Sequence, residues 1–265
     1  LCKQTLKDFE WLIVDDGSSD NTKDLVSGWV AENKIKIRYI FQSNGGKHRA
    51  INRGVNLAQG ILFFIVDSDD ILPQDSIRRI NNHYLMIKDH NEFGGLCGLK
   101  AYYDGRPVGN KSDFGIYECT NFEIDYKYKL SGDMAEVFLT SVLKEFPFPE
   151  IEGEKFCPEI LIWNRVSTKY IIHYFSENIY CCEYLEDGLT SKITKIRIKS
   201  PIASSMTYAD MVVAPIPLWA KIRAAINYWR FALYIQKFKR PKLPTCWHLI
   251  KPLGYLIFIR ESRNS

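Results

Sequence analysis

Three short strand-like segments, separated by helical segments, constrain the fold of this chain more than any other feature. Residues 11–14 and 61–66 are continuously apolar, and residues 35–41 alternate between apolar and polar side chains. Both patterns are typical of β-strands, and the second continuous run suits a strand buried on both faces. The intervening residues 22–33 and 47–59 have helical patterns. Strands that alternate with helices predict an α/β fold with a largely parallel sheet.

The later part of the chain has more mixed signals. We expect strands at 95–103, 171–175 and 179–185, and helices at 133–144 and 158–168. From about residue 200 the chain becomes more basic and mainly helical. The sequence therefore predicts an α/β domain over residues 1–200 and a basic helical appendage over residues 201–265.

A cluster of carboxylates directly follows the strand predicted at 61–66. Asp67, Asp69 and Asp70 stand at its carboxyl end, where open α/β sheets bind their ligands. Close carboxylates repel one another unless a cation lies between them. Mg²⁺ and Mn²⁺ prefer oxygen ligands and often combine one or two carboxylates with substrate phosphates. The cluster predicts a divalent-metal site, with an acidic turn or a helix N-cap as the alternative interpretation.

Two other polar loops are expected near the same sheet edge. Asp15 and Asp16 follow the strand predicted at 11–14 and could accept hydrogen bonds from a nucleobase or a ribose. Lys47 follows Gly45 and Gly46 at a predicted helix N-terminus, an arrangement suited to anionic groups. Taken alone, the first loop is more typical of a capped turn, because turns and N-caps favour Asp, Gly and Ser.

The order of these loops, DDGSSDNT, SNGGKHRAINRG and VDSDD, each after a predicted strand, resembles the family 2 glycosyltransferases of the GT-A fold. The resemblance is strong over residues 6–73 and extends more weakly to about residue 190. It implies a GT-A-type nucleotide-binding sheet with flanking helices. It also implies a glycosyltransferase of the type that builds bacterial surface polysaccharides.

The resemblance implies a role for each polar residue of these loops. Asp15 and Asp16 would contact the nucleobase and ribose of a nucleotide sugar, and Lys47 would lie near the nucleotide. Asp67 and Asp69 would bind the metal ion and the diphosphate, with Asp70 as a neighbouring metal ligand. The expected cofactor is Mg²⁺ or Mn²⁺.

The resemblance also implies a catalytic carboxylate near the start of a later helix. Relatives often carry a Glu-Asp pair there, and no such pair occurs in residues 148–165. Glu159 is the expected general base because it falls at the start of the helix predicted at 158–168, and Glu154 is the second candidate. The alternative interpretation of Glu159 is an acid that complements the helix dipole.

About one βα unit is missing from the front of the sheet if the resemblance holds. The family's domain usually opens with a further strand and helix, whereas only residues 1–8 precede the first apolar segment here. We therefore expect an N-terminally truncated catalytic domain whose sheet lacks an inner strand.

The appendage differs from the rest of the chain in charge. Residues 201–265 hold ten Lys and Arg residues but only two acids, Asp210 and Glu261, although the whole chain has a net charge of +4. Apolar residues recur at helical spacing between residues 219 and 233. Basic residues beside such a face suit reversible contact with an anionic membrane, and a core helix with a solvated charged face is the equal alternative. No nucleic-acid-binding module accompanies the charge.

The cysteines and the apolar runs bear on location. Seven cysteines without metal-ligand spacing indicate free thiols in a reducing compartment. No apolar run approaches the roughly 20 residues of a membrane-spanning helix. We expect a cytoplasmic protein that is peripheral on the inner face of the cell membrane.

These expectations combine into an inverting, metal-dependent glycosyltransferase of the hexosyltransferase type. It would move a sugar from a nucleotide donor, a UDP-sugar by resemblance, to a hydroxyl of a glycan or lipid-linked glycan. The process would be polysaccharide or cell-envelope biosynthesis. A sugar nucleotidyltransferase, and a non-catalytic fragment or pseudoenzyme that binds a partner, are the alternatives.

Overall fold

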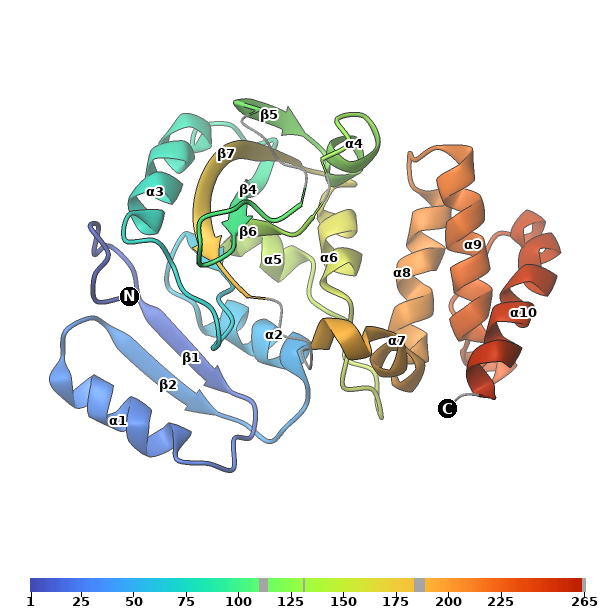
Figure 1. Ribbon diagram of the computed structural model, residues 1–265, viewed down its shortest axis with the longest axis horizontal. Coiled ribbons are helices and arrows are strands. Elements are labelled where there is room, and N and C mark those ends of the chain that lie inside the picture. The colour runs from blue at the N-terminus through green and yellow to red at the C-terminus, as the bar shows by residue number, and fades with distance from the viewer. Residues whose placement is uncertain (110–113, 131, 184–188, 264–265) are drawn as a thin grey trace. The chain divides into compact units, whose positions relative to one another are not determined.

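The computed structural model describes residues 1–109, 114–130, 132–183 and 189–263, shown as a ribbon in Figure 1. The chain forms two compact units. The first comprises residues 1–147 and 166–183, and the second comprises residues 148–165 and 184–265. An internal segment of the sequence is therefore part of the same unit as the C-terminal helices.

The first unit contains the strands of the described residues, together with helices that cover them. In chain order its elements are β1 (Trp11–Asp15), α1 (Thr22–Glu32), β2 (Ile37–Phe41), α2 (Lys47–Leu57), β3 (Leu62–Phe64), α3 (Ser76–Ile87), β4 (Phe93–Ala101), β5 (Ile116–Cys119), α4 (Asn121–Tyr126), β6 (Met134–Leu139), α5 (Thr140–Glu145) and β7 (Ile171–Cys181).

These strands form two sheets. β1 and β2 pair in parallel, with α1 beside them in Figure 1 and Trp29 of α1 stacked on Trp11 of β1. The other five strands have the order β3-β6-β4-β7-β5. β4 and β7 are parallel, whereas β6 is antiparallel to β3 and β4, and β5 is antiparallel to β7. β3, β4 and β7 therefore run in one direction, so their carboxyl ends lie at the same edge.

The α/β fold class and the first three strands and two helices are confirmed, but the prediction of a largely parallel sheet was wrong. The predicted helix at 133–144 was also wrong, since this segment is β6 followed by the short helix α5. β6 lies between β3 and β4, and Met134, Ala135, Val137 and Phe138 are all buried. A strand buried on both faces lacks alternation, so its pattern resembles that of a buried helix. The strands predicted at 171–175 and 179–185 are one strand, β7.

An apolar cavity of about 470 Å³ lies between the two sheets of the first unit. Its lining includes Leu12 of β1, Phe63 of β3, Ile80 of α3 and Val137 of β6. Within the described residues, β1 pairs only with β2 and β3 pairs only with β6. The cavity thus lies between β1 and β3, each of which has a paired strand on one side.

The second unit is helical where it is described. Its elements are α6 (Glu159–Val166, whose last residue falls in the first unit), α7 (Leu189–Lys199), α8 (Pro201–Val213), α9 (Leu218–Ala232), the 3₁₀ turns η1 (Lys237–Lys239) and η2 (Thr245–Ile250), and α10 (Lys251–Ser262). α8 packs along α9, and α10 packs on the other side of α9 (Figure 1). Within the described part of the chain, no helix is both long enough and apolar enough to cross a bilayer.

Candidate active site

A tyrosine distant in sequence fixes the acidic loop that follows β3. Tyr180 of β7 accepts a hydrogen bond from the backbone N–H of Asp67 (3.0 Å) and donates one to Oδ2 of Asp70 (2.7 Å). Just beyond β4, the Tyr103 hydroxyl donates to the backbone carbonyl of Asp69 at 2.9 Å. The carboxyl ends of β3, β4 and β7 therefore converge on this loop, at the edge where α/β sheets bind ligands.

The environment of Tyr180 keeps its hydroxyl in the donor form. Its side chain is buried, with the Phe64 ring against its own at an edge-on angle and the Lys100 ammonium 4.7 Å from the ring centroid. Burial, and next the hydrogen bond to Asp70, raise the pKa of Tyr180 far above its usual range. The hydroxyl therefore stays protonated and donates to Asp70 at any physiological pH.

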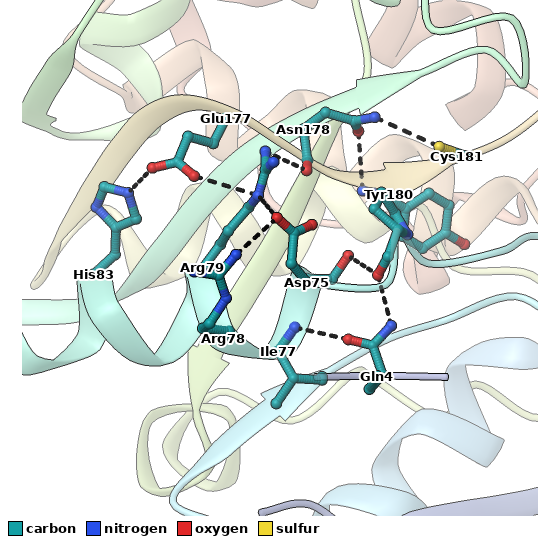
Figure 2. Close-up of polar contacts among 12 residues, drawn as sticks. Gln4, Asp75, Ile77, Arg78, Arg79, His83, Glu177, Asn178, Tyr180 and Cys181 are labelled. Atoms are coloured by element: carbon teal, nitrogen blue, oxygen red, sulfur yellow. Dashed lines mark hydrogen bonds and ion pairs between the residues drawn. The ribbon is translucent and has the colours of Figure 1, made fainter. Parts of the chain in front are cut away.

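The strand end that carries Tyr180 is itself tied to α3, as Figure 2 shows. Arg79 of α3 donates to the backbone carbonyl of Asn178 at 3.2 Å and is paired with Asp75 at 2.9 Å. The Asn178 side chain accepts a hydrogen bond from the backbone N–H of Tyr180 at 3.1 Å. Gln4 also contacts the start of α3, since its amide accepts from the backbone N–H of Ile77. These contacts hold the Tyr180 backbone in place and so help to orient its hydroxyl.

Lys47 and Asp67 form an ion pair across the same edge. The Lys47 ammonium, in the first residue of α2, lies 2.6 Å from Oδ1 of Asp67. Both side chains are partly exposed. The pair brings together two residues predicted to contact the nucleotide and the diphosphate, and it places a cation beside the acidic loop.

Asp16 holds the glycine loop that precedes α2. Its Oδ1 accepts from the amide of Gln42 (2.7 Å) and the backbone N–H of Gly45 (2.9 Å). Its Oδ2 accepts from the backbone N–H of Gly46 at 2.7 Å and from the Asn44 amide at 3.3 Å. A carboxylate has about four acceptor positions, so the protein itself uses most of this capacity. Asp16 therefore determines where Lys47 begins the helix.

Gly17 allows the loop that follows β1 to approach the glycine loop that precedes α2. Its φ of 86° lies in the left-handed region, and a Cβ there would lie 2.7 Å from the backbone nitrogen of Asn44. A side chain at this position would be strained and would push the loops apart. The glycine of the DDGS segment is thus required by packing as well as by backbone conformation.

Asp15, the last residue of β1, is buried and hydrogen-bonded on both oxygens. Oδ1 accepts from the backbone N–H of Ser18 at 2.7 Å, and Oδ2 accepts from the Tyr39 hydroxyl at 2.5 Å. Burial opposes ionisation, but these hydrogen bonds outweigh it and lower the pKa of Asp15 below its usual value. The same bond raises the pKa of Tyr39 to about 12. Asp15 is therefore a fixed anion at the base of the first loop.

The carboxylates of the acidic loop repel one another. Burial raises the pKa of Asp70, and the negative charges of Asp69 and Asp67 raise it further. The hydrogen bond from Tyr180 opposes this rise. No group of three or more His, Cys, Asp and Glu side chains in the described ranges is arranged as a complete metal cage. A metal ion held by one or two carboxylates and by substrate phosphates would need fewer protein ligands than such a cage, and the carboxylate oxygens of this loop are of the type that Mg²⁺ and Mn²⁺ prefer. One oxygen of Asp67 is paired with Lys47 and one oxygen of Asp70 accepts from Tyr180, and metal binding by Asp67, Asp69 and Asp70 stays a prediction.

The two glutamates predicted as bases belong to the second unit. Glu154 is buried, and its Oε1 and Oε2 accept from the backbone N–H groups of Ile202 (2.6 Å) and Ala203 (2.9 Å) at the start of α8. Burial raises its pKa, and the two hydrogen bonds oppose the rise. This is the geometry of a carboxylate that satisfies a helix N-terminus.

Glu159 differs from Glu154 in its position. It is the first residue of α6, as the sequence predicted, and it is only partly buried. Glu159 is therefore part of α6, whereas the side chain of Glu154 caps α8. The catalytic role of either glutamate stays a prediction.

Sequence reasoning missed the residues that position the loops. Tyr180, Tyr103 and Tyr39 lie in or next to strands and have no local signal, since a tyrosine in a strand is ordinary. Tyr180 contacts Asp70 from 110 residues away, and Tyr39 contacts Asp15 from 24 residues away. Only the pairing of the strands brings these hydroxyls to the carboxylates.

Residues 1–104 match the family described as glycosyl transferase family 2. Over 191 residues the chain is 36% identical to the glycosyltransferase GlyG of Streptococcus pneumoniae, a match that covers 68% of this chain and 62% of GlyG. It is 39% identical over 188 residues to alr2836 of Nostoc, an uncharacterized glycosyltransferase, with coverage of 69% and 52%. The chain thus spans less than two thirds of these relatives.

The fold is similar to that of TarS from S. aureus. The structure of TarS residues 1–349 in complex with UDP superimposes with a TM-score of 0.62 at 18% identity, covering 99% of this chain and 85% of that one. The corresponding complex of TarS with UDP-GlcNAc gives a TM-score of 0.58. At this level of identity the similarity establishes the mixed α/β architecture of the GT-A type.

Proposed function

We propose that the chain, whose residues 1–104 match the glycosyl transferase family 2, is an inverting glycosyltransferase. It would transfer a sugar, a hexose in the simplest case, from a nucleotide donor to a hydroxyl of a glycan. Inversion follows from a single displacement, in which the acceptor oxygen attacks the anomeric carbon as the nucleoside diphosphate leaves.

One observation carries the proposal: three loops predicted to bind the donor form one connected group. Asp16 binds the backbone of Gly45 and Gly46, the next residue Lys47 pairs with Asp67, and Tyr180 joins Asp67 to Asp70. The Lys47 cation suits a diphosphate directly, and the nearby carboxylates suit it when a divalent metal ion lies between them and the phosphates. The arrangement therefore supports a nucleoside diphosphate sugar as the donor.

The donor proposed is a UDP-sugar, since TarS, of similar fold, was solved with UDP and UDP-GlcNAc. Asp67 and Asp69 would hold Mg²⁺ or Mn²⁺, which when bound would neutralise charge on the leaving diphosphate. Lys47 would add a second positive charge beside the same group. Asp15 and Asp16 would form the floor of the nucleoside pocket through the loops that they hold.

Glu159 is the proposed general base that removes the acceptor hydroxyl's proton. The carboxylate of Glu154 is occupied by the backbone of α8, which favours Glu159 of the two. The acceptor proposed is a glycan or lipid-linked glycan of polysaccharide or cell-envelope biosynthesis, and the location proposed is the cytoplasmic face of the membrane.

Calorimetric titration of the purified protein with UDP, with and without Mn²⁺, tests the donor site. We expect UDP binding that requires the metal, and Asp69→Asn should weaken it by at least about tenfold because it removes a charged oxygen ligand. UDP binding that ignores both the metal and this substitution would contradict the proposal.

The products separate this function from its rivals. Incubation with UDP-sugars should release UDP, whereas a sugar nucleotidyltransferase would release or consume pyrophosphate. Metal-dependent UDP binding without turnover on any acceptor mixture would indicate a pseudoenzyme.

A further inference from the structure

The C-terminal helix α10 presents apolar residues on two opposite faces. Its inner face packs on α9, where a Cβ on Gly254 would collide with Trp229. On the same face, the rings of Phe258 and Tyr234 lie 4.7 Å apart and Glu261 pairs with Arg230. The inner residues 254, 258 and 261 recur at helical spacing, so this face is fully accounted for by the helix pair.

The opposite face of the helix is apolar and exposed. Leu253 and Leu256 are 48% and 65% exposed, and Leu249 in the preceding turn η2 is 84% exposed. Leu253, Leu256, Arg260 and Arg263 are spaced by three and four residues and so form one stripe along the helix. We call Leu249, Leu253, Leu256, Arg260 and Arg263 the outer face of α10.

The charge next to these leucines is positive and is not balanced within the segment. The acids of residues 201–265 are Asp210 and Glu261, and each is already paired, with Arg165 at 2.7 Å and with Arg230. In the described ranges no ion pair joins Lys251, Arg260 or Arg263 to an acid. Lys251 lies on the side of α10 that packs on α9, over the ring of Trp229 and 5.4 Å from its centroid. The outer face therefore combines exposed leucines with cations and lacks a compensating acid.

We propose that the outer face of α10 binds an anionic lipid surface. An interfacial helix inserts leucines to the level of the acyl chains while lysines and arginines contact lipid phosphates, and both contributions are present here. A second copy of the chain fits the face less well, because a symmetric contact would bring the same cations together. The length of α10, twelve residues, suits a helix that lies in the interface rather than one that spans the bilayer.

Co-sedimentation with lipid vesicles tests this proposal without any sugar transfer, so its failure would leave the proposed function standing. The chain should bind vesicles of phosphatidylcholine mixed with phosphatidylglycerol, bind pure phosphatidylcholine weakly, and lose most binding in high salt. The double variant Leu253→Ser, Leu256→Ser should lower partitioning onto the mixed vesicles by at least about tenfold, since it removes two inserted side chains.

The matched control is the double variant Leu85→Ser, Met86→Ser on α3 of the first unit, whose side chains are 54% and 55% exposed. It should bind like the unaltered chain. Circular dichroism should show both variants folded, because exposed substitutions rarely unfold a protein.

Equal binding of the α10 variant and the control variant would overturn the proposal. So would light scattering that shows a dimer lost only in the α10 variant, because the outer face would then bind a second copy. Binding that is indifferent to phosphatidylglycerol would also overturn it.

Discussion

At the scale of single residues, the carboxylates of this chain divide by what they bind. Asp16 and Glu154 accept hydrogen bonds from backbone N–H groups and so hold a loop and a helix start. Asp67 pairs with Lys47, and Asp70 with the Tyr180 hydroxyl. The sequence marked all of them as candidate functional residues, but their hydrogen bonds separate structural carboxylates from those at the ligand edge.

Tyr180→Phe should weaken Mn²⁺-dependent UDP binding by about tenfold, since it removes the hydroxyl that joins Asp67 to Asp70, and a hydrogen bond to a charged group is worth about 1.5–3 kcal/mol. Tyr174→Phe is the matched control, as Tyr174 is buried in the same strand and its hydroxyl contacts Asn121 instead. Calorimetric titration with UDP and Mn²⁺ measures the UDP affinity of both variants. Equal loss in the two variants would mean that Tyr180 only supports the strand.

Glu159→Gln should lower the rate of sugar transfer by about 10²- to 10⁴-fold, the usual contribution of a general base, and leave UDP binding unchanged. Glu154→Gln should instead lower the free energy of unfolding by about 1–3 kcal/mol, because an amide offers one acceptor oxygen to two N–H groups. Transfer assays and urea unfolding of both variants check this. The assignment of Glu159 fails if its variant retains full activity.

Asp15 should make stability depend on acid pH. Its folded-state pKa is below the usual 3.8, so its ionised form stabilises the fold above that value and this contribution is lost as pH falls through the folded pKa. Asp15→Asn should therefore lower the urea midpoint near neutral pH, and the difference from the unaltered chain should shrink from about pH 5 to about pH 3. A difference that is constant over this range would contradict the assignment.

At the scale of elements, the close pairing of β4 with β6 depends on a glycine. A Cβ on Gly95 would collide with the backbone carbonyl of Val137 in the paired strand. Because β3, β6 and β4 are adjacent, this pairing also positions β3 and the acidic loop at its end.

Gly95→Ala should destabilise the protein by about 2 kcal/mol or more, the range of overpacked cores. Gly28→Ala in α1 has open space around its Cβ and should stabilise the helix by up to about 1 kcal/mol, since alanine is the better helix former. Urea unfolding of the two variants measures the contrast. A neutral Gly95→Ala variant would show that β6 can move away without loss.

At the scale of the whole molecule, the second compact unit includes residues 148–165, which lie before the predicted domain boundary at residue 200. Glu154 and Arg165 lie before this boundary, yet they bind residues 202–203 and Asp210 after it. Phe156 likewise donates its backbone N–H to the hydroxyl of Ser200.

A chain that ends at residue 200 should therefore unfold at lower temperature and aggregate. It retains the apolar side chains of residues 161 and 162, fully buried in the complete chain, but loses the partners of Glu154 and Arg165. Thermal melting and size-exclusion chromatography measure this outcome. A monomeric fragment with an unchanged melting temperature would show that residues 1–200 do not depend on residues 201–265 for their stability.

The sequence by itself determined the order of strand, polar loop and helix in residues 11–70, because local periodicity and turn residues act over a few positions. That order was enough to predict the α/β fold and a carboxylate cluster at the sheet edge, whereas the ion pair between Lys47 and Asp67 emerged only from the structure. It could not identify β6, whose burial on both faces removes the alternation that marks a strand. Only the tertiary structure decided that Tyr180 fixes the acidic loop and that Glu154 caps α8. These roles depend on contacts between residues 110 and 48 positions apart, and no local pattern encodes such distances.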